Sequence, residues 1–192
     1  MKKKIGIVVA ALVLVVLVCV GFYVVKKGSN KNTTELTEVQ MILTRNLEKD
    51  YPLTPRQVVS FYNRIIKAYY GESFSDEEFE KMVDQTRKLF DDELLENNPR
   101  AEYVSALKAE ITSYNSNNKT ISSSDVSDSS DIKYKNDTQK DDSLAFVDAS
   151  YFMKEGKSTF TKTYMQFVLR KDESGKWKIL GFYKIDAPSS ED

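Results

Sequence analysis

The chain has no histidine and a single cysteine, Cys19, which lies inside an apolar stretch near the N-terminus. The rest of the chain therefore has no thiol nucleophile, no imidazole base and no cysteine pair for a disulfide. These absences exclude histidine-based catalytic triads and zinc sites built on histidine or cysteine. The formal net charge of −1 argues against a basic surface for nucleic acid. We expect no cofactor, no metal site and no nucleic-acid partner.

A long apolar segment runs from Ile5 to Val25 without a charged residue. Its 21 residues, at about 1.5 Å of rise each, reach across a hydrocarbon core of ~30 Å. We predict that residues 5–25 form a transmembrane helix and that their partner is membrane lipid. A cleaved secretory signal is the alternative, but the apolar region of such signals usually has only about 7 to 15 residues. An uncleaved anchor is therefore favoured.

The charges on the two sides of this segment nearly balance, because three lysines precede it at 2–4 and three follow it by residue 31. The positive-inside rule alone does not decide the orientation. A very short N-terminal tail before a long polar domain favours a cytoplasmic N-terminus. We predict a single-pass cell-membrane protein with a cytoplasmic tail at 1–4, a linker at 26–34 and an extracytoplasmic C-terminal domain.

Helix start signals mark the first half of the polar region. Apolar residues at three-to-four spacing predict an amphipathic helix over 35–50. The sequence Thr54-Pro55-Arg56-Gln57 supplies an N-cap, a proline at the first helical position and a capping-box glutamine for a second helix, which Gly71 ends. A second capping box, Ser75 to Glu78, begins a third helix, and Asn98-Pro99 begins a fourth.

The second half changes from polar residues to strand formers. Residues 115–142 are rich in Ser, Asn and Asp, which predicts a flexible polar segment with one weak strand near 131–135. Residues 187–192 are expected to be a disordered tail. Three runs of β-branched and aromatic residues predict consecutive antiparallel strands over Leu144–Met153, Thr159–Arg170 and Lys176–Ile185.

Helices followed by a strand meander predict an α+β fold, in which three to four helices pack on a curved antiparallel sheet of three to four strands. Side chains alternate between the two faces along each strand, so one face is expected to meet the helices. This alternation places Tyr183 on the same face as Trp177. The predicted inward-facing core residues are Val147, Ala149, Tyr151, Phe167, Leu169, Trp177 and Ile179.

The opening helix, Pro55–Tyr62, and the closing hairpin, Phe167–Ile179, resemble parts of cystatin-like domains, specifically the nuclear-transport-factor-like and ketosteroid-isomerase-like ones. On this resemblance the domain spans 51–186. It implies a cone of helices and curved sheet whose open end can hold a small ligand. The chain also resembles membrane-anchored bacterial proteins with this layout, and that likeness implies no function.

The resemblance carries no catalytic residue onto this chain. Enzymatic members of the class use Asp or His with Tyr, and histidine is absent here. Asp148 shares strand parity with Leu144 and Phe146, whereas the inward face is expected to carry Val147 and Ala149.

Five aromatic residues are the candidate ligand-binding residues: Tyr62, Tyr69, Tyr151, Trp177 and Tyr183. An aromatic ring with a polar tip suits an apolar ligand that needs one hydrogen bond, although such residues also fill cores. We predict a non-enzymatic, membrane-tethered binding or interaction module whose partner is an envelope protein or a small apolar ligand. The alternatives are a small ketosteroid-isomerase-like enzyme that uses carboxylate and tyrosine side chains, and an accessory subunit of a membrane complex.

Overall fold

Five helices precede five strands in the part of the chain that this computed structural model describes, residues 36–137 and 142–187. The predicted tail at 1–4, membrane segment at 5–25 and linker at 26–34 lie outside the described residues, as does 188–192 of the predicted C-terminal tail. Within the described ranges, no helix combines the length and the apolar character that crossing a membrane requires.

The helices begin at the predicted start signals. Thr54 accepts a hydrogen bond from the backbone N–H of Gln57 at 3.2 Å, and Ser75 forms the predicted capping box with Glu78. The side chain of Gln57 accepts from the N–H of Leu53 rather than from that of Thr54. The helix bounds are α2 Glu38–Thr44, α3 Pro55–Gly71, α4 Asp76–Arg87, α5 Asp92–Asn97 and α6 Arg100–Ser116.

The predicted helix over 35–50 is too long, because α2 ends at Thr44. The side chain of Asn46 accepts hydrogen bonds from the N–H groups of Glu48 and Lys49 at 2.9 and 3.3 Å, so a turn replaces the helix there. Helix α5 was not expected. None of its six residues is buried, so it has no apolar stripe that a sequence pattern could reveal.

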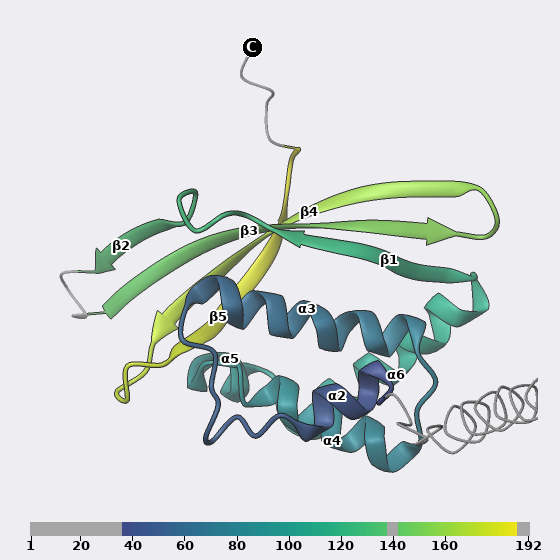
Figure 1. Ribbon diagram of the computed structural model, residues 1–192, viewed down its shortest axis with the longest axis horizontal. Helices are drawn as coiled ribbons and strands as arrows, with labels where there is room; N and C mark the ends of the chain where they lie inside the picture. Colours follow the sequence, from purple (N-terminus) through teal and green to yellow (C-terminus); the bar gives the residue numbers. More distant parts are fainter. Residues whose placement is uncertain (1–35, 138–141, 188–192) are drawn as a thin grey trace, which may run out of the picture. The chain divides into compact units, whose positions relative to one another are not determined.

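The five strands pair antiparallel in the order β1-β3-β4-β5, and β2 also pairs with β3. Figure 1 shows the curved strands above the helices, which cover one face of the sheet. The predicted class, helices packed on a curved antiparallel sheet, is confirmed, but both layers have more elements than predicted. The strand bounds are β1 Lys119–Val126, β2 Lys133–Asp137, β3 Asp142–Glu155, β4 Thr159–Lys171 and β5 Trp177–Ile185.

Strand β1 is the main departure from the predicted flexible segment at 115–142. The weak strand expected near 131–135 corresponds to β2, but β1 precedes it in the same segment. Only Ile121 and Val126 are buried on β1, and its register shifts between Ile121 and Ser123. An irregular edge strand of this kind loses the alternation of polar and apolar residues by which strands are recognised.

All of the predicted inward-facing residues on the strands are buried, with the least buried, Tyr151, only 8% exposed. The expectation for Tyr183 is wrong, because β5 contains a bulge. Val168 pairs with Gly181 whereas Leu169 pairs with Ile179, so one extra residue lies between them on β5. A bulge of one residue exchanges the two faces of the strand beyond it. Tyr183 is therefore exposed.

Candidate functional site

A cavity of about 310 Å³ lies between the inner face of the sheet and helices α3 and α6. Pockets that bind small molecules usually measure about 300 to 1,000 Å³ and are mostly apolar. This cavity has the composition of such a site and is at the small end of the range. Its lining residues are Tyr62, Ile66, Tyr70, Tyr103, Ala106, Leu107, Glu110, Tyr114, Ile121, Tyr151, Met153, Thr163, Met165, Phe167 and Phe182.

Helix α3 and the strands form the inner walls. Tyr62, Ile66 and Tyr70 recur every fourth residue and so lie on one face of α3. Tyr151 and Met153 are two residues apart on β3 and share its inward face. The periodicity of each element thus directs its side chains into the same space.

Phe182 closes the cavity on the side of β5. Its ring centroid lies 5.7 Å from that of Tyr62 and 5.3 Å from that of Phe167. It is nevertheless 41% exposed, so it lies between the cavity and solvent. The bulge in β5 causes this placement, because without it Tyr183 would face the helices.

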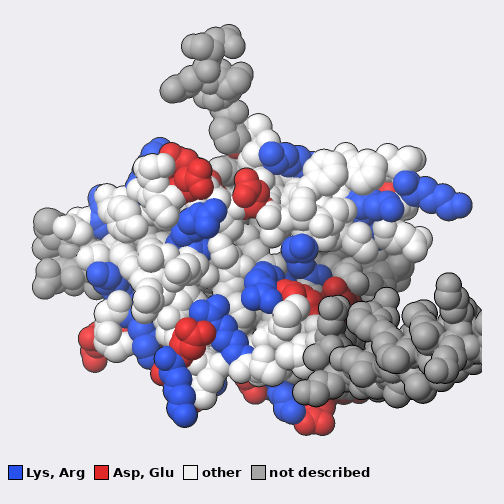
Figure 2. All heavy atoms as spheres, viewed as in Figure 1, with Lys and Arg blue, Asp and Glu red and all other residues white. Residues whose placement is uncertain are grey.

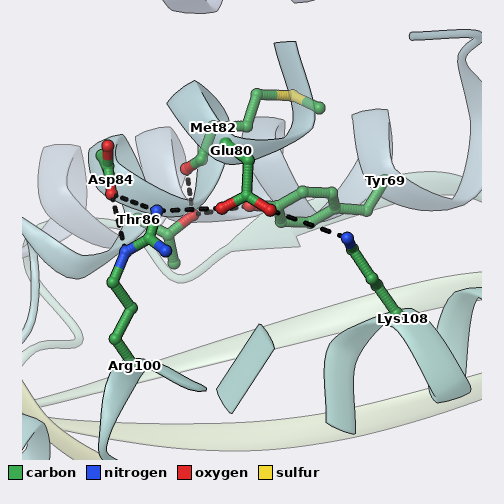
Figure 3. Close-up of polar contacts among 7 residues, drawn as sticks. All are labelled: Tyr69, Glu80, Met82, Asp84, Thr86, Arg100 and Lys108. Atoms are coloured by element: carbon green, nitrogen blue, oxygen red, sulfur yellow. Dashed lines mark hydrogen bonds and ion pairs between the residues drawn. The ribbon is translucent and has the colours of Figure 1, made fainter. Parts of the chain in front are cut away.

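Helix α6 forms the outer wall, and ion pairs hold it against α4. Arg100 Nη2 lies 2.9 Å from carboxylate oxygens of both Glu80 and Asp84, and Lys108 Nζ lies 3.6 Å from Glu80 (Figure 3). Exposed pairs contribute only about 0 to 1 kcal/mol each. Together they fix the position of α6, and they direct these two cations toward α4.

The cavity holds tyrosine hydroxyls in apolar surroundings. Burial raises the pKa of Tyr62 well above its usual value, and the neighbouring tyrosines raise it further. Burial also raises the pKa of Tyr151, whose hydroxyl donates a hydrogen bond to Asn63 Oδ1 at 2.6 Å. These phenols stay neutral at physiological pH and can donate hydrogen bonds.

Glu110 is the one charged side chain among the described residues that line the cavity. It is exposed on α6, at the solvent side of the cavity. Burial first, and then the charge of Glu110, raise the pKa of Tyr70 and of Tyr114. Burial also raises the pKa of Tyr103 to about 12. The charge of Arg87 lowers this pKa, and the charge of Glu110 raises it. The carboxylate therefore lies close to three phenols.

Neither Asp148 nor Glu110 is enclosed within the cavity. The outer face of the sheet carries Asp148, whose Oδ1 accepts a hydrogen bond from Gln166 Nε2 at 2.8 Å. Tyr183 also bonds to Gln166 on that face. The acid that does line the cavity, Glu110, is exposed to solvent. An enzyme that moves a proton needs such a group within hydrogen-bond reach of the reacting atom.

The structure brings together two of the five predicted ligand-binding residues, since Tyr62 and Tyr151 both line the cavity. Tyr69 instead lies between α3 and α4, where its hydroxyl meets a threonine of α4 (Figure 3). Trp177 is buried at the far end of the sheet, next to Tyr134, and Tyr183 is on the outer face. That the two lining residues bind a ligand stays a prediction.

Sequence reasoning missed most of the outer wall. Tyr70 follows Tyr62 by two helical turns, and this spacing was the available signal for it. Tyr103 and Tyr114 belong to the helix predicted to begin at Asn98-Pro99, but the sequence did not identify them as cavity residues. Phe182 gave no signal, because its inward position depends on the bulge.

Comparison with known proteins gives a family without an activity. The family described as a domain of unknown function (DUF6715) matches residues 1–182. The match takes in the apolar segment at 5–25 and every residue that lines the cavity. No curated protein matches the chain in sequence.

Proposed function

The chain belongs to the DUF6715 family, and we propose that its folded domain binds a small, largely apolar ligand in the cavity between α3, α6 and the sheet. The module is non-enzymatic and is tethered to the outer side of the cell membrane through residues 5–25. The observation that carries the proposal is the cavity itself, because it opens to solvent and has the mostly apolar lining with a few polar groups that is usual for small-molecule sites.

The volume of the cavity limits the size of the ligand. An engineered apolar cavity of about 150 Å³ stays dry and binds benzene. A cavity of about 310 Å³ is roughly twice as large, so it accommodates a ligand of about two fused rings. Removing the surface of such a ligand from water contributes about 25 cal/mol per Å² of apolar area.

The lining supplies adaptability and hydrogen bonds. Met153 and Met165 both face the cavity, and unbranched methionine side chains adjust to ligands of different shape. The neutral phenols of Tyr62 and Tyr103 offer donors to a single polar group. On the face shown in Figure 2, basic and acidic side chains are interspersed rather than gathered into one basic field. This distribution supports a small ligand in preference to nucleic acid.

The tether is supported by the uncharged apolar segment at 5–25, which the family match includes. Protease added to intact cells that express the full chain is expected to digest the folded domain, because the tether places it outside the cytoplasm. Immunoblotting of a C-terminal epitope measures the digestion, and a cytoplasmic protein that survives shows that the cells stayed intact. Survival of the domain would contradict the topology, and a chain shortened by its first 25 residues would indicate a cleaved signal.

Ligand binding is tested with 2-naphthalenemethanol, a neutral bicyclic probe, and the full chain in zwitterionic lipid nanodiscs. Titration calorimetry is expected to show saturable binding of one probe per chain beyond the signal of empty nanodiscs. Thr163→Phe puts a ring into the cavity, because Thr163 lines it, and is expected to weaken binding by at least about tenfold.

Thr161→Phe is the matched control, because Thr161 is an exposed residue of the same strand that does not line the cavity. It is expected to leave binding unchanged. The proposed function would be contradicted if the unsubstituted chain showed no saturable binding of 2-naphthalenemethanol, nor of a cationic or an anionic probe with the same naphthyl ring. Conversion of an added β,γ-unsaturated ketone to its α,β-unsaturated isomer, lost in Thr163→Phe, would instead support the isomerase-like alternative.

A further inference from the structure

We infer that the ligand of this cavity carries a cationic ammonium end, which is held where Glu110 meets the rings of Tyr70, Tyr103 and Tyr114. The inference rests on the proposed function, because it names the ligand class for the same cavity. Three features support it: the sign of the charge in the lining, the aromatic rings beside that charge, and the engagement of the nearest cations with another helix.

The lining carries negative charge only. Glu110 is a carboxylate, and no lysine or arginine is among the described residues that line the cavity. A ligand with an anionic end would place like charges together at the solvent side of the site, whereas an ammonium group would meet an opposite charge. The apolar remainder of the same ligand would fill the inner part of the cavity, where Met165 and Phe167 lie.

Aromatic rings surround the position of this charge. The rings of Tyr70 and Tyr114 are stacked, with centroids 4.2 Å apart and an angle of 25° between their planes. Tyr103 meets Phe90 edge to face at 5.7 Å. Ring faces attract cations, and groups of aromatic side chains are the usual means of recognising quaternary ammonium. The phenols remain neutral because burial and Glu110 both raise their pKa values, so their rings are uncharged and electron-rich. The guanidinium of Arg87 already lies 5.8 Å from the ring centroid of Tyr103, and Tyr70 and Tyr114 each keep one ring face outside their mutual stack.

The cations of α6 do not neutralise Glu110. Lys108 pairs with Glu80 and lies 4.9 Å from the ring centroid of Phe79, both on α4. Arg100 is bound to two carboxylates of the same helix (Figure 3). Across residues 36–137 and 142–187, no lysine or arginine forms an ion pair with Glu110. A hydrogen bond from the Tyr70 hydroxyl, which contributes to the raised pKa of Tyr70, holds the carboxylate beside the rings. Within this part of the chain its charge is left without a cationic partner, which an ammonium group of the ligand would supply.

Three probes with the same naphthyl ring test the inference on the full chain in zwitterionic nanodiscs. They are (2-naphthylmethyl)trimethylammonium, neutral 2-naphthalenemethanol and anionic 2-naphthylacetate, each corrected for partition into empty nanodiscs. The cation is expected to bind about tenfold more tightly than the neutral probe, and the anion more weakly than both, because cation–π and exposed ion-pair contributions each add modestly. Raising the ionic strength is expected to reduce the advantage of the cation.

Glu110→Gln removes the charge and keeps the shape of the side chain. It is expected to weaken binding of the cation about fivefold and to leave binding of the neutral probe unchanged. Glu102→Gln is the control, because Glu102 is exposed on the same helix outside the cavity lining, and it is expected to change neither. Equal binding of cation and neutral probe, or a Glu110→Gln chain that keeps full affinity for the cation, would overturn this inference while leaving the proposed function in place. Failure of all three probes to bind would overturn both.

Discussion

At pH 11 the folded domain is expected to be less stable than at pH 8 by roughly 7 kcal/mol, an effect of buried tyrosines. Tyr51, Tyr62, Tyr69, Tyr70 and Tyr151 are all buried, and burial is the largest cause of the raised pKa of each. In the unfolded chain these phenols lose their protons near pH 10, whereas in the folded chain they keep them. The stability they provide is therefore complete below pH 10 and is lost as the pH rises above it.

The size of the effect follows from proton linkage. One pH unit above the unfolded pKa, each phenol that stays protonated in the fold favours the unfolded state by about 1.4 kcal/mol. Five such groups give a loss comparable with the whole stability of a small domain, about 5 to 15 kcal/mol. Unfolding is expected to be cooperative near pH 11 to 12, with the 295 nm phenolate absorbance of the buried tyrosines appearing together with the loss of circular dichroism.

Tyr69→Phe provides the control for this prediction. The hydroxyl of Tyr69 is 3.3 Å from Thr86 Oγ1. Removing this hydroxyl leaves one fewer proton to be released when the chain unfolds. Urea titrations at several pH values are therefore expected to show a shallower decline of stability above pH 10 in this variant. Phenolate absorbance from most tyrosines at pH 11 with the circular dichroism intact would contradict the prediction.

Asp91→Ala is expected to lower the unfolding free energy by about 4 kcal/mol, because Asp91 joins three elements. Its buried carboxylate pairs with Arg170 on β4 and accepts a hydrogen bond from the N–H of Glu93 at 3.0 Å, which caps α5. Its own N–H donates to the carbonyl of Ile179 on β5 at 2.9 Å. The alanine variant keeps the backbone hydrogen bond to Ile179, but it loses the pair with Arg170 and the cap of α5.

Urea unfolding of the full chain in nanodiscs measures this loss. Glu93→Ala is the matched variant, because its exposed carboxylate lies 3.4 Å from the same arginine, and it is expected to cost less than about 1 kcal/mol. Asp91→Asn retains a capping oxygen and is expected to fall between the two variants. A loss below about 1 kcal/mol for Asp91→Ala would show that the pair contributes no more than a surface contact.

The parts of the fold that the sequence predicts are those governed by local chemistry. The side-chain caps of Thr54 and Ser75 set the starts of α3 and α4, and strand alternation identifies the buried face of β3 and β4. Strand β1 could not be recognised, since its residues are polar and its pairing with β3 comes from tertiary structure. The bulge in β5 also comes from pairing, and it exchanged the expected positions of Phe182 and Tyr183.

The candidate site was predictable only on its inner side. Tyr62 and Tyr151 belong to elements with a strong apolar face, so their inward direction follows from periodicity. The outer wall belongs to α6, on which Leu107 alone is fully buried. A helix that covers a cavity with half-exposed tyrosines shows no clear stripe, so neither Tyr103 nor Glu110 could be assigned to a site from spacing alone.

Methyl NMR of the full chain tests most directly whether the cavity binds a ligand, because two of its methionines line the cavity. With ¹³C-methyl methionine and (2-naphthylmethyl)trimethylammonium, the resonances of Met153 and Met165 are expected to shift saturably and to show contacts with the naphthyl protons. Met41, exposed on α2, and Met82, a buried residue of α4, are expected to remain unchanged. Unperturbed Met153 and Met165 resonances at saturating probe, or shifts confined to Met41, would contradict binding in the cavity.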